Sequence, residues 1–277
     1  MTAGSAPDSP GKIGLAWIHQ EFEIDRGYGD LYRYALEASP CRDLPTPMAL
    51  GDTGYDVVPC LAPGTVAQAL ALSLDGAGRS RIPALGDDEL RHLLDLVLSP
   101  TLDAAIKGVF KTEYAVIFAG GDTSRPGAEA DPATKASYRW HCDAGPKKHL
   151  KVLVYLDEAD SHDGATAVAD RLTTDRFKEA GYVFGPVPDR VGDLAVLAQT
   201  LGLCDVVSDR LSPPAGHGIV FEPVNVLHRG VAPTFGQRRI LTLGLVPFPM
   251  GWRQCFTQFA PGIRENAGFQ FPMMRKG

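Results

Sequence analysis

The sequence predicts a mainly β protein with supporting α-helices, and the order of its patterns carries this prediction. Helical patterns gather in the first part of the chain, and short strand-like runs separated by turns follow from residue 112 onward. Helices followed by short strands are typical of a β-sandwich or barrel covered by helices. With 277 residues, of which 44% are hydrophobic, the chain can bury one sizeable core.

The N-terminal part is predicted to be irregular and then helical. Residues 1–12 are rich in Gly, Ala, Ser and Pro, which predicts a disordered N-terminus before a single domain over residues 13–277. Three later stretches show an Ala/Leu-rich pattern, an acidic start or a preceding proline. They cover residues 65–74, 87–98 and 101–110. Together they predict a helical buttress at about residues 60–110, that is, a group of helices that supports the β core.

Strand-like runs predict a β core at about residues 112–250. These runs are rich in β-branched and aromatic residues, and turn-forming residues separate them. They cover residues 112–119, 137–141, 149–156, 216–223, 224–230 and 239–248. We also expect a long polar loop over residues 120–135, a helix over residues 192–202 and a C-terminal extension over residues 251–277.

Composition narrows the functional classes. A net charge of −6 and a pI of about 5.6 argue against non-specific nucleic-acid binding. The five cysteines are scattered and form no C-x-x-C pair, which argues against a disulfide framework and a thiolate zinc site. The sequence contains no signal-like start and no apolar run of membrane-spanning length. We therefore expect a cytoplasmic protein without a membrane span.

The segment YRWHCDAGPKKH contains two metal-binding residue types, His141 and Asp143. In an extended segment alternate side chains share a face, so these two point the same way. His228, on a later strand-like run, completes a set of two imidazoles and one carboxylate. Such a set with open metal positions is typical of non-haem Fe(II) oxygenases, although zinc accepts the same ligand types.

An arginine follows the distal histidine at the start of the last predicted strand. Alternation along this strand puts Arg238, Ile240 and Thr242 on one face. An arginine and a hydroxyl beside the metal strand can bind a ligand carboxylate through charge-assisted hydrogen bonds. The pattern therefore predicts an anion anchor next to the metal site.

Several motifs, in this order, resemble a known family. They are Trp140-His141-Cys142-Asp143, Gly164-Ala165-Thr166, Gly218-Ile219-Val220-Phe221-Glu222 leading to His228, and Arg238 before the final strand. Over about residues 112–250 the chain resembles the Fe(II)/2-oxoglutarate-dependent oxygenase superfamily, in particular its phytanoyl-CoA hydroxylase-like branch. Two features depart from the branch: His217-Gly218 stands where Gly-Asp is common, and the spacing from His228 to Arg238 is one residue shorter than in some members.

The resemblance implies a double-stranded β-helix core, also called a jelly roll or cupin-like fold. It makes His141, Asp143 and His228 the Fe(II) ligands, and Arg238 the anchor of the cosubstrate 2-oxoglutarate with help from Thr242. Arg239 remains a competing anchor because of the shorter spacing, and Lys151 is a third candidate, because some branches of the superfamily anchor 2-oxoglutarate by a lysine on a neighbouring strand. The implied reaction is a hydroxylation by O2 with release of succinate and CO2. The carboxylate of Asp143 argues against chlorination, because related halogenases have a small residue in its place.

Basic residues around the metal motif suggest a hypothesis about the substrate. The first interpretation is a solvated basic face balanced by acidic neighbours. The functional alternative is that Lys147 and Lys148, with Arg139, steer an anionic small molecule to the metal. A sugar acid, an amino acid or a natural-product intermediate would suit this hypothesis. Two other functions remain open: a zinc-dependent hydrolase or isomerase on the same ligands, and a non-catalytic jelly-roll binding protein.

Overall fold

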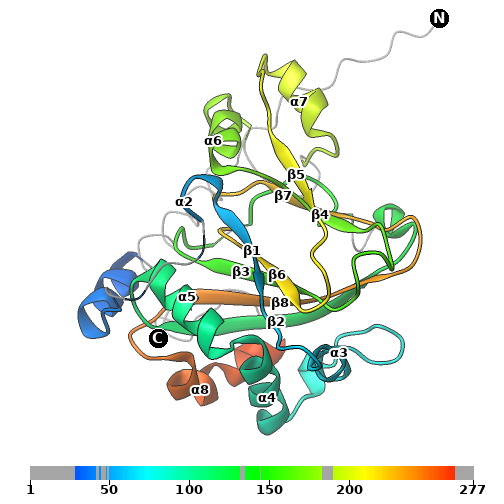
Figure 1. The fold of residues 1–277 in the computed structure, drawn as a ribbon. Helices are drawn as coiled ribbons and strands as arrows, with labels where there is room; N and C mark the ends of the chain where they lie inside the picture. The colour runs from blue at the N-terminus through cyan, green and yellow to red at the C-terminus, as the bar shows by residue number, and fades with distance from the viewer. Residues whose placement is uncertain are drawn as a thin grey trace, which may run out of the picture.

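Two antiparallel sheets face each other in the structure (Figure 1). This computed structural model describes residues 29–41, 44, 48, 50–131, 135–143, 145–182 and 190–265. The larger sheet has the strand order β1-β6-β3-β8-β2, and the smaller sheet has the order β5-β4-β7. The strands are β1 Tyr55–Pro59, β2 Tyr114–Ser124, β3 Leu150–Tyr155, β4 Ala165–Ala169, β5 Ser208–Leu211, β6 His217–Phe221, β7 His228–Val231 and β8 Arg238–Pro247.

The chain alternates between the two sheets in the manner of a jelly roll. From β2 it passes to residues 140 and 141, which lie beside β7 because His141 bridges to His228. It then enters β3 in the larger sheet, β4 and β5 in the smaller one, and β6, β7 and β8 in alternate sheets. This arrangement is a double-stranded β-helix and confirms the predicted jelly-roll, cupin-like core. Its consequence is a space between two sheet faces in which residues distant in sequence meet.

Helices cover the outer faces of both sheets (Figure 1). On the larger sheet lie α3, α4, α5 and α8, and beside the smaller sheet lie α6 and α7. Residues 29–38 are also helical. The remaining helical bounds are α2 Leu50–Thr53, α3 Val66–Ser73, η1 Ile82–Ala84, α4 Asp87–Val97, α5 Pro100–Phe110, η2 Ala128–Ala130, α6 Arg171–Glu179, α7 Leu194–Thr200 and α8 Trp252–Glu265.

Helix α4 illustrates how local sequence builds this cover. Three acidic residues occupy its first turn, where the helix dipole favours negative charge. The carboxylate of Glu89 also accepts a hydrogen bond from the backbone of Gly86 at 3.1 Å. On the opposite face the buried residues Leu90, Leu93, Leu94 and Val97 recur at helical spacing. Each such side chain contributes about 1.5–3 kcal/mol when it is buried against the sheet.

Alternate side chains along the strands of the larger sheet face either the apolar core under the helices or the space between the two sheets. Leu241, Leu243 and Leu245 of β8 pack against the helices, whereas Arg238 and Thr242 face the other sheet. Between the sheets, a smaller apolar cluster includes Tyr155, Phe221 and Ile240 from the larger sheet and Val168 from β4. Apolar and polar side chains therefore both face the inner space.

Several element predictions need correction. The polar loop expected over residues 120–135 begins later, because β2 continues to Ser124 in pairing with β8. Residues 137–141 form no strand and make only isolated bridges. The run 224–230 becomes strand only at His228, because a turn precedes it.

Other elements were not expected from the sequence. β1 lies in the stretch predicted to be irregular, and β4, β5, α6 and α8 were not foreseen. Within the predicted C-terminal extension, α8 packs on the core, and residues 266–277 lie outside the described residues. The predicted disorder of residues 1–12 also lies outside them.

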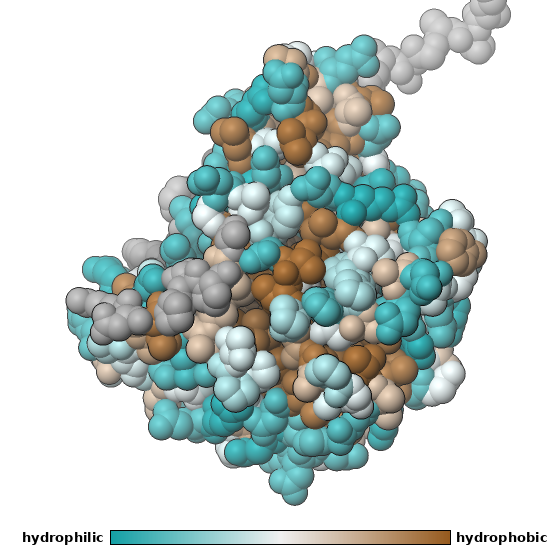
Figure 2. All heavy atoms as spheres, in the orientation of Figure 1, coloured by the Kyte–Doolittle hydropathy of each residue, from teal (hydrophilic) through white to brown (hydrophobic). Residues whose placement is uncertain are grey.

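Polar residues cover much of the visible face, and hydrophobic residues gather near its middle, around the position of β1 (Figure 2). β1 is an edge strand with β6 as its neighbour. Its side chain Val57 is 39% exposed. Among the described residues, no helix is both long enough and apolar enough to cross a bilayer.

Candidate metal centre

A cavity of about 380 Å³ lies between the two sheets. This volume falls within the range of small-molecule sites. Strands of both sheets contribute to its wall, together with the segment before β3. Its polar and charged lining consists of Asp122, Ser137, Tyr138, His141, Lys151, Thr166, His228, Arg229, Arg238 and Thr242.

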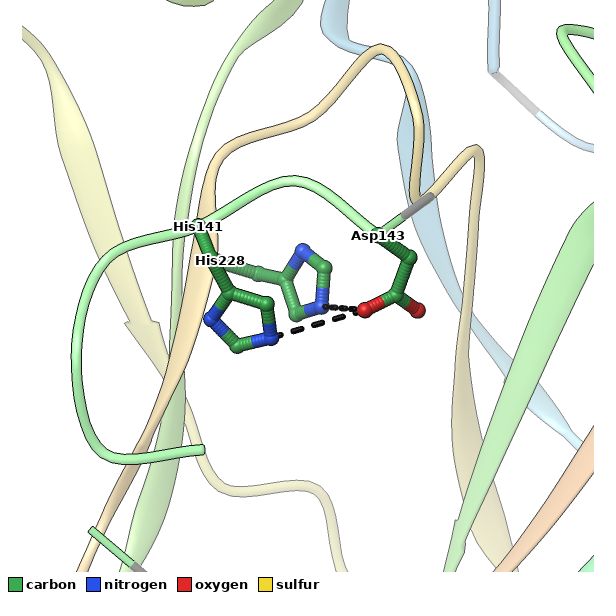
Figure 3. A group of neighbouring side chains, drawn as sticks. All are labelled: His141, Asp143 and His228. Carbon is green, nitrogen blue, oxygen red and sulfur yellow. Dashed lines mark ion pairs between the residues drawn. The ribbon is translucent and has the colours of Figure 1, made fainter. Parts of the chain in front are cut away.

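His141 and His228 lie side by side on the wall of this cavity (Figure 3). Their backbones exchange two hydrogen bonds, with N–O distances of 3.1 Å from His141 to His228 and 2.9 Å in the reverse direction. Residues paired in this way project their side chains to the same side of a sheet. The two ring centroids are accordingly 4.4 Å apart.

Backbone carbonyls orient both imidazoles. His141 Nδ1 lies 2.6 Å from the carbonyl oxygen of Arg139, and His228 Nδ1 lies 2.9 Å from that of Val226. Because a carbonyl only accepts, each Nδ1 carries a proton, and in the neutral form of such a ring Nε2 presents a lone pair. His228 Nε2 is buried and has no hydrogen-bond partner among the described residues. A buried lone pair of this kind fits a metal ligand.

Asp143 brings a carboxylate to the same point (Figure 3). Its Oδ1 lies 3.5 Å from His141 Nε2 and 3.6 Å from His228 Nε2. The three potential ligand atoms lie within 4.8 Å of one another. Asp143 belongs to no strand, and its backbone N–H is held by the carbonyl of Pro223 at 2.8 Å. Two imidazoles and one carboxylate converging on one side fit a divalent metal with open positions.

The protonation states also suit metal binding. Burial raises the pKa of Asp143, but the ammonium of Lys151 and the two histidines outweigh it and hold that pKa well below its usual range. Burial lowers the pKa of His228 to about 4, and neighbouring His141 acts in the same direction. At neutral pH Asp143 is therefore ionised and His228 is neutral, as metal coordination requires.

Arg238 enters the same cavity from β8 and is 3% exposed. Its guanidinium donates to the carbonyl of Ala165 and lies 6.0 Å from the centre of the Tyr155 ring. Its Nε has no hydrogen-bond partner, and no carboxylate of the described residues forms an ion pair with it. A buried cation that forms no ion pair is costly, so this position favours an anionic ligand.

The two other residues of the predicted anchor lie in different surroundings. Thr242 lines the cavity, opposite Gly120 of β2 and Leu153 of β3. Arg239 points away from it and pairs with Asp157, with its Nε 2.9 Å from Oδ1. The structure thus brings Arg238 and Thr242, but not Arg239, to the histidines.

The three basic residues of the substrate hypothesis do not line the cavity. Lys147 and Lys148 are exposed on the segment before β3. Arg139 donates to the carbonyl of Arg190 at 3.3 Å. None of these three basic side chains therefore forms part of the cavity wall.

Some residues that line the cavity or contact Arg238 were not singled out from the sequence. Ser124 and Tyr138 bond to each other at 2.8 Å between their oxygens, next to Arg238. Asp122 precedes them on the inner face of β2. The signal that could have found Ser124 and Asp122 is alternation, once GGDTS is read as strand instead of loop. Tyr138 offered no comparable signal.

No family model matches the sequence, and no curated protein matches it either. Among solved structures, the fold resembles that of EctD from S. alaskensis with bound Fe, at 14% identity, 76% and 82% coverage of the two chains and a TM-score of 0.47. It also resembles the α-ketoglutarate-dependent epimerase SnoN from nogalamycin biosynthesis, at 13% identity, 80% and 83% coverage and a TM-score of 0.44.

A third similar structure is HygX from Streptomyces hygroscopicus with nickel, 2-oxoglutarate and hygromycin B bound. Its identity to this chain is 15%, with coverage of 73% of this chain and 86% of that chain and a TM-score of 0.43. All three similarities are distant and concern the overall fold.

Proposed function

We propose that the protein is a non-haem Fe(II)- and 2-oxoglutarate-dependent dioxygenase that hydroxylates a small molecule. One observation carries the proposal: the two histidines of a His/Asp/His group line the same cavity as a buried guanidinium that forms no ion pair with any described carboxylate. The first part fits a divalent metal, and the second fits the carboxylate of an anionic cosubstrate. The metal alone would suit zinc as well, but zinc hydrolysis gives Arg238 no role.

Each residue of the site has a separate task in this proposal. His141 Nε2, Asp143 Oδ1 and His228 Nε2 would hold the metal, and the carbonyl bonds to both Nδ1 atoms keep the rings in place. Arg238 would orient the distal carboxylate of 2-oxoglutarate, assisted by the hydroxyl of Thr242. Bound Fe(II) with 2-oxoglutarate supplies oxidation by O2, with release of succinate and CO2.

The cavity itself supports a small-molecule substrate. About 380 Å³ accommodates a cosubstrate and a further small group, and the inner wall contributes the apolar side chains of Phe118, Leu153 and Ile240. These side chains present an apolar surface to a substrate inside the cavity. A role for Lys147 and Lys148 would be confined to attracting a substrate from solution.

A cosubstrate assay tests the proposal without knowledge of the substrate. Protein loaded with Fe(II) should convert 2-oxoglutarate to succinate slowly in air, and the Arg238→Gln variant should lose this conversion. Protein loaded with Zn2+ is the matched control and should be inactive. Absence of succinate, together with absence of 2-oxoglutarate binding, would reject the proposal and favour a hydrolase or a binding protein.

A further inference from the structure

Lys151 contacts the carboxylate of the metal centre, and the geometry points to a role in charge balance. We propose that Lys151 neutralises Asp143, so that a bound divalent metal retains its full charge toward a dianionic cosubstrate. This inference rests on the proposed function, because it assigns a role to a residue of the same site. Lys151 is a positioning residue that acts through Asp143.

The position of Lys151 is unusual for a lysine. It lies on β3 in the middle of the larger sheet, opposite Phe221 of β6 and Gly244 of β8. Its side chain faces the cavity and is 21% exposed. Lysine at the centre of a sheet is costly unless its charge is compensated. A partner for this ammonium is therefore expected within the cavity.

That partner is the carboxylate of Asp143. Lys151 Nζ donates to Asp143 Oδ2, while Oδ1 faces the Nε2 atoms of the two histidines. The two oxygens thus have different tasks: one is held by the ammonium and the other is left for a metal. Asp143 lies outside any strand, so its backbone alone fixes the carboxylate less firmly than a strand would. The contact from Lys151 of β3 helps to hold the carboxylate in place.

The net charge of a bound metal and its ligands differs according to whether Lys151 is included. Two neutral imidazoles and one carboxylate reduce a divalent metal to a net charge of about +1, whereas the added ammonium restores about +2. 2-Oxoglutarate carries two carboxylates, and one of them would be met by the metal and the other by Arg238. Lys151 therefore favours binding of the dianion and disfavours binding of the metal alone.

Paired binding measurements test this inference. Mn2+ serves as a redox-inactive probe of the metal site, and calorimetry gives its affinity and then the affinity of 2-oxoglutarate for the Mn2+-loaded protein. Lys151→Met removes the charge, Lys151→Gln keeps a hydrogen-bond donor without the charge, and Lys151→Arg keeps the charge. Lys135→Met, at an exposed lysine outside the cavity, is the matched control.

We expect opposite changes in the two affinities. In Lys151→Met and Lys151→Gln the affinity for Mn2+ should rise, and that for 2-oxoglutarate should fall, each by about tenfold. Lys151→Arg and Lys135→Met should stay within about threefold of the wild type. A merely structural role would lower both affinities together. Thermal melting of each metal-free variant checks that it is folded, and Lys151→Gln provides the test if Lys151→Met does not fold.

The outcomes separate this inference from the proposed function. If the wild type binds Mn2+ and 2-oxoglutarate but Lys151→Gln binds both as the wild type does, charge balance is wrong and the proposed function stands. Parallel losses of both affinities in a folded Lys151→Gln variant would also overturn it. If the wild type binds no 2-oxoglutarate, the proposed function and the inference fail together.

Discussion

Ser124 and Arg238 lie opposite each other across the β2–β8 pair, and Arg238 Nη2 donates to Ser124 Oγ at 3.3 Å. The same hydroxyl oxygen accepts a hydrogen bond from Tyr138 at 2.8 Å. Ser124 is itself 1% exposed, so the contact is shielded from water. A chain of Tyr138, Ser124 and Arg238 thus fixes the guanidinium that the proposed function assigns to the cosubstrate.

Loss of this chain should weaken cosubstrate binding without affecting the metal. Ser124→Ala removes one hydrogen bond from Arg238, and a buried bond of this kind is worth about 1 kcal/mol, or roughly fivefold in affinity. Calorimetry on Mn2+-loaded protein should show this decrease for 2-oxoglutarate and an unchanged affinity for Mn2+. Ser161→Ala, at an exposed serine, should bind both ligands normally. Equal weakening of both ligands would contradict the assignment.

Arg238 and Arg239 should have different roles, the first in 2-oxoglutarate binding and the second in stability. Arg238→Gln removes the buried charge that faces the cavity, and we expect the affinity for 2-oxoglutarate to fall at least a hundredfold, because a bidentate charged contact is lost. Arg239→Gln removes the partner of Asp157 and should lower the melting temperature while it leaves 2-oxoglutarate binding intact. If Arg239→Gln instead abolished 2-oxoglutarate binding, Arg239 would be the anchor.

Each of the three metal-site residues should be required for metal binding. Asp143→Ala and His228→Ala each leave only two ligands, and the affinity for Mn2+ should fall by a factor of about 100 or more. His92→Gln is the matched control, because His92 is exposed and lies outside the cavity. Retention of Mn2+ affinity in either alanine variant would show that the cluster is structural.

The metal-free protein should lose stability in mild acid. Burial lowers the pKa of both His149 and His228 to about 4, against about 6.5 in an unfolded chain. Between these values the unfolded state binds protons that the folded state does not. The free energy of unfolding should therefore fall with decreasing pH, by up to about 1.4 kcal/mol per pH unit for each histidine.

Urea unfolding at a series of pH values measures this slope. The depressed pKa of Asp143 adds a further loss only at still lower pH, because its stabilising effect persists until the carboxylate is protonated. His149→Gln should reduce the slope by about half. A free energy of unfolding that is constant from about pH 7 to about pH 4.5 would contradict the assignment of neutral, buried imidazoles.

The convergence of His141, Asp143 and His228 was predictable because the signals are local. His141 and Asp143 are two residues apart, and His228 and Arg238 each begin a strand of the structure. Alternation then puts Arg238 and Thr242 on one face and Arg239 on the other, as the structure has them. Local patterns of this kind need no knowledge of which strands pair.

Other features depend on contacts between distant segments. Gly120 and Gly121 have turn-like composition, yet pairing with Thr242 and Leu241 of β8 makes them strand, because tertiary pairing overrides local propensity. The contact between Lys151 and Asp143 likewise requires β3 to lie next to β6 and β8. The basic run appeared relevant to the substrate because it adjoins the metal motif, but adjacency in sequence does not determine which side chains face the cavity.

The most direct test of the account is an anaerobic titration of the metal-free protein with Fe(II) and 2-oxoglutarate, followed by visible absorption. We predict a weak metal-to-ligand charge-transfer band that requires both components and that is lost in His228→Ala and Arg238→Gln. Bound Fe(II) without any such band at saturating 2-oxoglutarate would contradict the assignment of this centre as a 2-oxoglutarate-dependent oxygenase.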